Sequence, residues 1–408
     1  MNMIEERTGL LVARGEGVYA FSHLTFQEYL AAVAIAAQDD YVAYTLAYTA
    51  EAWWREVILL EAGHLSMRSK ERTARLIRAI AEQTREPQPY HNLVLASDCL
   101  RDVGSGRVQG NVEQEVQQRL RKELEIPPRP QARWLGRMAG KSWVERRSEA
   151  MQAIVRAGGG YWTQPFGEPE WVHVPAGEFW MGSEKGFERE RPLHRLSLGE
   201  FWIARIPVTN AQYALIVQQS DHRAPDGWEE KTPLKGRESH PVVNVSWDDA
   251  MACCAWLSRM SGRTITLPTE AQWEKAARGD QDQREYPWGD AFDAMKCNSE
   301  ELGHGDTTPA GIFPEGVSPY GCLDMAGNVR EWTRSKLAGY PYDPADGRER
   351  IEIARSAGRV VRGGSFSGNV RLVRCAARHW YLPLNRNGFV GFRVVLSPSP
   401  LGDGASGR

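Results

Sequence analysis

The sequence lacks the features that mark several classes of protein. Its 408 residues include only six cysteines, with no C-x-x-C pair and no dense spacing, so neither a disulfide scaffold nor a zinc module is indicated. Charge is balanced, with 50 Lys and Arg against 52 Asp and Glu, which excludes a strong global attraction to nucleic acid or to an acidic membrane. The longest apolar run, 29–37, is far shorter than the roughly 20 residues that span a bilayer. We therefore expect a cytoplasmic protein with no nucleic-acid partner and no membrane span.

Glycine and tryptophan, in contrast, are abundant. The chain holds 39 Gly and 15 Trp, and most of the tryptophans lie beyond position 160. This composition is typical of an irregular, loop-rich domain rather than a helical bundle. Because the chain is too long for one compact core, we expect about two or three domains.

The first third of the chain has a helical pattern. Apolar residues between positions 24 and 121 recur at spacings of three and four, as in Phe26, Tyr29, Leu30 and Val33. The sequence PPRP that follows is typical of a semi-rigid linker. We predict a helical region over 1–126, a connector over 127–168, a C-terminal domain over 169–396 and a disordered tail over 397–408.

Capping signals predict two helices inside the C-terminal domain. Ser246 begins S-W-D-D, a cap followed by acidic residues, and the apolar run after it stops at Gly262. Thr269 and Gln272 have the spacing of a capping box, and that helix is predicted to end at Gly279.

A series of motifs in the C-terminal domain closely resembles the formylglycine-generating-enzyme, or sulfatase-modifying-factor, family. The resemblance implies an α+β protein with a C-type-lectin-like fold of that family's type, preceded by a smaller all-α N-terminal region. The motifs, in family order, are WVHVPAGEFWMGS (171–183), PVTNAQY (207–213), HPVVNVSWDDAMACCAWL (240–257), LPTEAQWEKAARG (267–279), YPWG (286–289), DMAGNVREWT (324–333), VVRGGSF (360–366), RCAAR (374–378) and GFRVV (391–395).

We interpret most of these motif residues as structural. A buried Trp side chain has a large apolar surface and one N–H donor. The planar guanidinium of Arg has several N–H donors that can bind backbone carbonyls. Both suit loops that lack a regular hydrogen-bond ladder. The residues given this role are Trp247, Trp273, Trp288, Trp332, Arg362, Arg378 and Arg393.

The catalytic groups of the family are missing. The enzymes that this chain resembles use two cysteines that bind copper, placed between the RGGS and RCAAR motifs, but 366–373 contains no cysteine. Cys375 alone cannot form a two-coordinate thiolate site. The related sulfoxide synthases need a histidine-rich iron site, and His23, His64 and His91 are far apart in the sequence. We therefore expect no copper, no catalytic residues and no enzymatic activity.

One loop suits a hard cation. The segment DMAGNVRE alternates carboxylates and backbone carbonyls, which are ligands that calcium prefers. By the resemblance, the ligands would be Asp324, Glu331 and the carbonyls of Gly327 and Val329. A structural calcium ion is one reading, and a loop without an ion is the other.

The region 362–393 resembles the variable proteins of diversity-generating retroelements, in which adenine-templated mutagenesis rewrites surface codons near the C-terminus. Their invariant frame has the form RGGSW, R-x-A-x-R, P, R and GFR, and this chain departs from it only at Phe366, where Trp is usual. The frame here is Arg362, Gly363, Gly364, Ser365, Phe366, Arg374, Ala376, Arg378, Pro383, Arg386, Gly391, Phe392 and Arg393.

The residues between the frame positions are chemically mixed, as in a binding surface with aromatic anchors among small and polar neighbours. A buried strand over 379–382 is the alternative. Trp380, Tyr381 and Leu382 are consecutive, however, so a strand would place them on both faces and expose at least one. The predicted ligand-binding residues are Phe366, Ser367, Gly368, Val370, Leu372, His379, Trp380, Tyr381, Leu382, Asn387, Gly388, Phe389 and Val390.

The N-terminal segment carries a second resemblance. FSHLTFQEYLAA (21–32) resembles the segment after the nucleotide-binding core of NACHT-type signalling ATPases, and ERTGLLV (6–12) with VYAF (18–21) resembles the end of the winged helix before it. The sequence shows no Walker motif upstream, so ATP hydrolysis by that route is not expected. One interpretation is a helical adaptor that links the binding domain to a signalling ATPase as its partner. A helical region that only packs is the alternative.

The leading prediction is a non-enzymatic variable protein whose ligand is a macromolecule, expected to be a protein. Two alternatives stay open. One is an oxidoreductase of the formylglycine-generating type with an atypical site, and the other is an undiversified adaptor of a NACHT or STAND signalling system.

Overall fold

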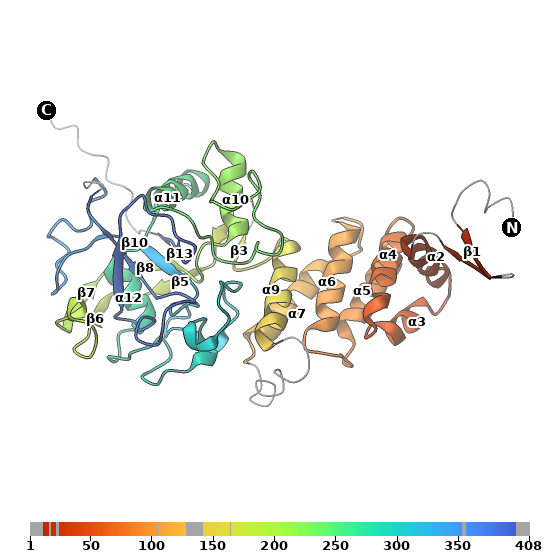
Figure 1. Ribbon diagram of the computed structural model, residues 1–408, viewed down its shortest axis with the longest axis horizontal. Helices are drawn as coiled ribbons and strands as arrows, with labels where there is room; N and C mark the ends of the chain where they lie inside the picture. Colours follow the sequence, from red (N-terminus) through yellow and green to blue (C-terminus); the bar gives the residue numbers. More distant parts are fainter. Residues whose placement is uncertain are drawn as a thin grey trace. The chain divides into compact units, whose positions relative to one another are not determined.

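The computed structural model describes most of the chain, and the units named below can be followed in Figure 1. The tail, most of the winged-helix segment before residue 11 and residues 128–141 of the predicted connector lie outside the described residues. The chain divides into two compact units, Met1–Glu123 and Leu124–Arg408. The described residues are 11–15, 18–21, 24–104, 106–127, 142–163, 165–352 and 356–396.

The first unit contains a hairpin and a series of helices. Strands β1 (Leu11–Gly15) and β2 (Val18–Phe21) pair antiparallel. The helical pattern predicted from residue 24 onward is confirmed, and α4 packs on α2, α5 and α6 around buried apolar side chains such as Ile58 and Ile77. The helices are α2 (Leu24–Ala36), α3 (Tyr41–Tyr48), the 3₁₀ turn η1 (Ala52–Trp54), α4 (Arg55–Ser66), α5 (Lys70–Glu82), α6 (His91–Val103) and α7 (Val112–Glu125).

The predicted connector over 127–168 contains a helix, α9 (Trp143–Arg156). A capping box begins it, because the Ser142 hydroxyl accepts from the Glu145 backbone N–H while the Glu145 carboxylate accepts from that of Ser142. Arg147 of α9 is buried and its Nε donates to the carbonyl of Ile312 at 2.7 Å. This part of the connector is therefore packed into the second unit rather than free of it.

Two four-stranded sheets form the centre of the second unit. One has the strand order β5–β8–β14–β9 and the other β12–β11–β10–β13, in which β10 and β13 run parallel and the remaining pairs antiparallel. Two short hairpins, β3–β4 and β6–β7, accompany them. The strands are β3 (Trp162–Thr163), β4 (Glu168–Pro169), β5 (Trp171–Val174), β6 (Gly177–Met181), β7 (His194–Leu198), β8 (Phe201–Ala204), β9 (Ile265–Thr266), β10 (Arg330–Lys336), β11 (Arg359–Arg362), β12 (Arg378–Tyr381), β13 (Val390–Phe392) and β14 (Val395–Leu396).

The two helices predicted from capping signals are confirmed. Helix α11 (Trp247–Ser261) has Ser246 as its N-cap and ends at Gly262, whose φ of 68° is left-handed and favours glycine. Helix α12 (Glu270–Arg278) has the predicted Thr269 capping box. A further helix, α10 (Asn210–Gln219), begins with a capping box of the same kind.

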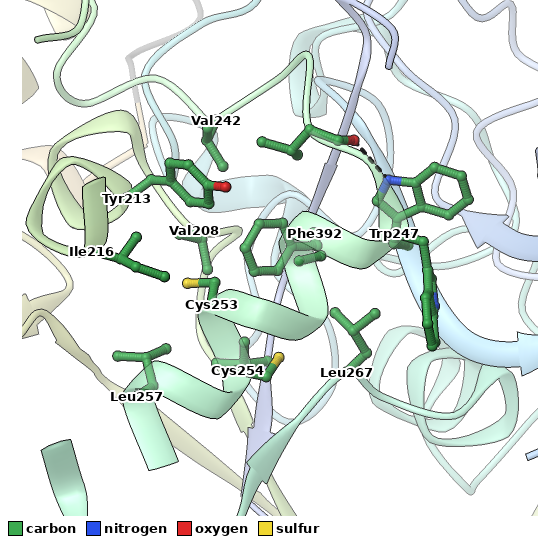
Figure 2. Packing of buried hydrophobic residues seen from close by; sticks show 14 of the residues in the cluster. Val208, Tyr213, Ile216, Val242, Trp247, Cys253, Cys254, Leu257, Leu267 and Phe392 are labelled. Carbon is green, nitrogen blue, oxygen red and sulfur yellow. Dashed lines mark hydrogen bonds between the residues drawn. The ribbon is translucent and has the colours of Figure 1, made fainter. Parts of the chain in front are cut away.

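The largest core of this unit lies between α10, α11 and the second sheet. Phe392 of β13 contacts Tyr213 of α10, with ring centroids 6.3 Å apart and planes at 79° (Figure 2). Trp332 of β10 is fully buried, and its Nε1 donates to the carbonyl of Val245 at 3.0 Å. Trp247, Trp273 and Trp332 are thus buried as predicted, whereas Trp288 is only half-buried. Among the described residues, no helix has the length and apolar character that crossing a bilayer requires.

Candidate functional site

The frame arginines lie beneath the candidate surface and are paired with carboxylates. Arg362 of β11 and Arg378 of β12 are directly opposite each other in the sheet, and both are fully buried. Glu270 accepts from both, at 2.6 Å from Nη2 of Arg378 and 3.4 Å from Nη1 of Arg362. Glu274 pairs with Arg362 as well. Burial alone would raise the pKa of Glu274, but the charges of Arg362 and Arg278 hold it below its ordinary value.

A second buried pair joins two of the motifs. Arg393 donates from Nε and Nη2 to the two oxygens of Glu331, at 2.6 and 2.8 Å, and Nε1 of Trp273 donates to the same carboxylate at 2.7 Å. The remaining N–H groups of Arg393 reach the carbonyls of Ala204 and Leu323. This bidentate geometry fixes the chain entering β14 against β10.

These contacts do not fit the predicted calcium site. Both oxygens of Glu331 are occupied by donors, and the charge of Arg393 would repel a cation. Asp324 accepts from the backbone N–H of Gly311 at 2.8 Å, and burial raises its pKa to about 6. In the described part of the chain, no group of three or more His, Cys, Asp or Glu residues is placed to hold a metal ion.

The carbonyl ligands of that predicted site sit in a tight crossing of two loops. Gly327 approaches Asn298 so closely that a Cβ at Gly327 would lie 2.2 Å from the Asn298 carbonyl oxygen. The side chain of Val329 is fully buried. Packing therefore accounts for Gly327 and Val329, as ion pairing accounts for Glu331.

All six cysteines are buried and free. Burial raises the pKa of Cys375 to about 12, so its thiol stays protonated at neutral pH. Cys253 and Cys254 are consecutive on α11, and both belong to the apolar cluster that Figure 2 shows. None of these thiols has the exposed, cationic surroundings that produce a reactive thiolate.

The predicted ligand-binding residues differ in exposure. Trp380 and Leu382 are 42% and 47% exposed, and Ser367 and Gly388 are exposed as well. The half-exposed members are Phe366, Val370, Leu372, His379, Tyr381, Asn387 and Phe389.

Two of the predictions are wrong. Val390 is fully buried in the core, because β13 pairs with β10 and places Val390 opposite Arg330. Gly368 is buried in a tight turn, where its N–H donates to the carbonyl of Ser365 at 2.8 Å. Neither residue can present a side chain to a ligand.

The structure brings the aromatic candidates of β12 together. The His379 ring lies 5.2 Å from Trp380 and 5.0 Å from Tyr381, and Tyr381 lies 6.3 Å from Phe389. The candidates 366–372 lie in the loop after β11, which is held by the N–H of Val370 donating to Glu301 at 2.6 Å. The candidate site thus has a strand part and a loop part.

Sequence reasoning missed the basic residues beside the strand. Arg330 of β10 stacks on Tyr381 and Phe389, and Arg189 donates from Nε to the carbonyl of Arg378 at 2.6 Å. These contacts join positions far apart in the sequence. No simple alternation marks Arg330 in the sequence, because the next three residues of β10, Glu331 to Thr333, are all buried.

Comparison with known proteins agrees with this architecture. Residues 162–398 match the model of the sulfatase-modifying factor enzyme 1-like domain, and residues 1–35 match that of a winged helix-turn-helix domain C-terminal to NACHT. The chain is 33% identical over 244 residues to serine/threonine-protein kinase pkn1 of Chlamydia caviae, with 55% of this chain and 38% of the kinase covered. The chain therefore spans well under half the length of that relative.

Other relatives are covered more fully. The formylglycine-generating enzyme of Streptomyces coelicolor is 31% identical over 285 residues, covering 55% of this chain and 88% of the enzyme. Among solved structures, PvdO from Pseudomonas aeruginosa aligns with a TM-score of 0.48 at 27% identity, covering 55% of this chain and 93% of PvdO. Treponema denticola variable protein 1 aligns with a TM-score of 0.46 at 21% identity, covering 58% of this chain and 98% of that protein.

The matched model covers more than half of the chain, and the motifs that it spans are the ones that form the two sheets, the capped helices and the buried arginine pairs. The chain therefore belongs to the sulfatase-modifying factor enzyme 1-like family, with an α+β, C-type-lectin-like domain of the formylglycine-generating-enzyme type over residues 162–398.

Proposed function

We propose that this chain is a non-enzymatic, ligand-binding variable protein of a diversity-generating retroelement. The observation that supports the proposal is the difference in burial between two groups of residues within 362–393. The frame residues Arg362, Arg378 and Arg393 are fully buried and ion-paired, whereas Trp380 and Leu382 between them are largely exposed. Substitution at the exposed positions would leave the buried pairs in place, which is what a diversified surface requires.

The strand β12 supports this division most clearly. Arg378 points into the protein toward Glu270, while its neighbours from His379 onward contact one another and solvent. Aromatic residues of this kind give a large contact area at small cost in conformational entropy, as they do in antibody binding loops. The candidate surface after correction consists of Phe366, Ser367, Val370, Leu372, His379, Trp380, Tyr381, Leu382, Asn387, Gly388 and Phe389.

The chemistry of the site supports the absence of catalysis. The loop 366–373 holds no cysteine, and burial raises the pKa of Cys375, so a copper-binding thiolate pair has no counterpart here. The relatives include formylglycine-generating enzymes, so the alternative function is oxidation of a cysteine at an atypical site.

We further propose that the N-terminal helical region links the binding domain to a NACHT-type signalling ATPase. The match of residues 1–35 to a domain that follows NACHT supports this role. Co-purification with such an ATPase encoded nearby, and loss of that association on deletion of residues 1–123, would test the link.

Sequencing of the DNA around the gene tests the main proposal. We expect a near-repeat of the codons for 362–393 that differs at adenines, next to a reverse transcriptase gene. The differences should fall at codons of the exposed residues and spare those of Arg362, Arg378 and Arg393. Conversion of a sulfatase-type cysteine peptide to formylglycine at turnover rates, with or without added copper, would support the alternative.

A further inference from the structure

A series of basic and aromatic side chains runs alongside β12. Two arginines stack on one phenyl ring, with the guanidinium carbons of Arg189 and Arg371 lying 4.5 and 4.8 Å from the ring centroid of Phe187. Arg189 also donates from Nε to the carbonyl of Arg378, the residue before His379. Phe187 and Arg189 therefore connect the loop that carries Arg371 to the first residue of β12.

The series continues to the other end of the strand. His379 contacts Tyr381, and Arg330 lies over Tyr381 at 5.9 Å and over Phe389 at 5.5 Å. Arg330 also donates to the Tyr381 hydroxyl. Contacts thus lead without a break from Arg371 to Arg330. We call this surface the cationic face and define it as Arg189, Arg330, Arg371, Phe187 and Tyr381. Exposed Trp380, the strand neighbour of Tyr381, borders it from the other side of β12.

The three arginines of the cationic face have no carboxylate partner among the described residues. Arg374 and Arg378 next to them are paired with Glu190 and Glu270. Burial lowers the pKa of Arg189, and the charges of Arg378 and Arg330 add to this effect against the opposing charge of Glu190. Arg371 is exposed and Arg189 and Arg330 are half-buried, so all three guanidinium groups remain open to an anion that another molecule supplies.

A hollow that is lined by Arg189, but not by Arg330 or Arg371, provides room for part of that molecule. It has a volume of about 740 Å³ and is lined by Arg189, Arg191, Tyr340 and the backbone of Gly339, among others. Exposed Glu188 also borders it and makes no ion pair with another described residue. The hollow is large enough to receive side chains of a peptide.

We propose that the ligand of the cationic face is an acidic segment of a protein, whose carboxylates pair with Arg189, Arg330 and Arg371 while its apolar side chains pack on Trp380. The inference rests on the proposed function and specifies the class of its ligand. A protein segment is favoured over nucleic acid because the chain has a net charge of −2, and phosphate-backbone binding depends on a broad basic surface.

The test is fluorescence anisotropy on the full chain with labelled peptides of equal length and equal aromatic content, one rich in Glu, one uncharged and one rich in Lys. A thymidine oligonucleotide with the charge of the acidic peptide is the fourth probe. The variants are the triple change Arg189→Gln, Arg330→Gln and Arg371→Gln, and the single change Glu188→Gln. Arg223→Gln is the matched control, because Arg223 is exposed, is paired with Asp226 and is not part of the cationic face.

We expect the parent to bind the acidic peptide about tenfold more tightly than the uncharged one, and the triple variant to lose this preference. Glu188→Gln should strengthen acidic-peptide binding, and Arg223→Gln should leave it unchanged. Glu188→Gln keeps the test decisive if the triple variant fails to fold.

The inference would be overturned if the parent bound the acidic and uncharged peptides equally, or did not bind the acidic one. It would also be overturned if Arg223→Gln lost as much affinity for the acidic peptide as the triple variant. Oligonucleotide binding as tight as that of the acidic peptide would replace it with a nucleic-acid ligand. If an uncharged peptide binds and Trp380→Ser with Leu382→Ser abolishes the binding, the inference fails while the proposed function stands. If neither the triple arginine variant nor Trp380→Ser with Leu382→Ser changes the binding of any probe, the proposed function fails as well.

Discussion

Arg362 and Arg378 lie directly opposite each other in the register of β11 and β12, so two like charges are held side by side in the interior. Glu270 and Glu274 of α12 balance them. The start of the segment 362–393 is thereby tied to a helix that lies far from it in the sequence. Trp380 and Leu382, which are exposed, take no part in these ion pairs.

Removal of Glu270 should be among the most destabilising single changes in the second unit. Glu270→Gln leaves two buried guanidinium groups with one carboxylate fewer, and loss of one partner from a buried pair costs about 3–5 kcal/mol. Urea unfolding monitored by tryptophan fluorescence measures the change. Glu188→Gln, an exposed acid without an ion pair in the described structure, is the control and should be within about 0.5 kcal/mol of the parent.

The pair of Arg393 and Glu331 should behave as one unit. Arg393→Met and Glu331→Gln each strand a buried charge, so each single variant should lose stability, and the double variant should lose clearly less than the sum of the two. A double-mutant cycle of unfolding free energies gives the coupling. Strict additivity would show that the two side chains act independently, contrary to the geometry.

The exposed positions should tolerate change. Trp380→Ser combined with Leu382→Ser should shift the unfolding free energy by no more than about 1 kcal/mol, since exposed substitutions cost roughly half a kcal/mol each. Trp332→Ala should cost about 3–5 kcal/mol, because it empties a fully buried site. Thermal melts of the two variants side by side make the comparison. Unfolding of the surface variant with an unaffected Trp332→Ala would place Trp380 and Leu382 in the core.

The first unit should show a pH dependence that comes from Glu61. Burial raises the pKa of this residue from 4.5 to about 7, although the hydroxyl of Thr45 donates to one of its oxygens at 2.7 Å and opposes the shift. The folded state therefore holds a proton that the unfolded state releases, and stability falls as the pH rises from about 4.5 to about 7.

Glu61→Gln should remove this part of the pH dependence. Hydrogen exchange of the α4 amides at pH 5 and pH 8, corrected for intrinsic rates, makes the comparison. The parent should lose protection at the higher pH, and the variant should keep it. The same loss in both proteins would assign the effect to another group.

Local signals in the sequence predicted local structure well. The Ser246 and Thr269 caps fixed the starts of α11 and α12, since each depends on residues three positions apart. Helix α10 was missed although Thr209 and Gln212 carry the same signal. Helix α9 lies in an Arg-rich segment that indicates a connector, although Ser142 and Glu145 have the spacing of a capping box.

Features that depend on contacts between residues far apart in the sequence could not be predicted from local patterns. The buried role of Arg362, Arg378 and Arg393 was predicted, but not their carboxylate partners, which lie tens of residues away. The burial of Val390 follows from the parallel pairing of β10 with β13. The local sequence does not reveal this pairing, so the prediction that Val390 lies at the surface is wrong. Glu331 was assigned to calcium because the motif alone does not reveal that Arg393 binds it.

We expect the frame residues, with Glu270, to carry the fold, and the residues between them to form only the surface. Two libraries test it directly, one randomised at Ser367, Trp380, Leu382 and Gly388, and one of equal size at Glu270, Arg362, Arg378 and Arg393. Protease resistance of the displayed variants, read by sequencing, measures the folded fraction of each. We predict that most surface variants stay resistant while nearly all frame variants are cleaved. Equal loss of resistance in the two libraries would contradict the account.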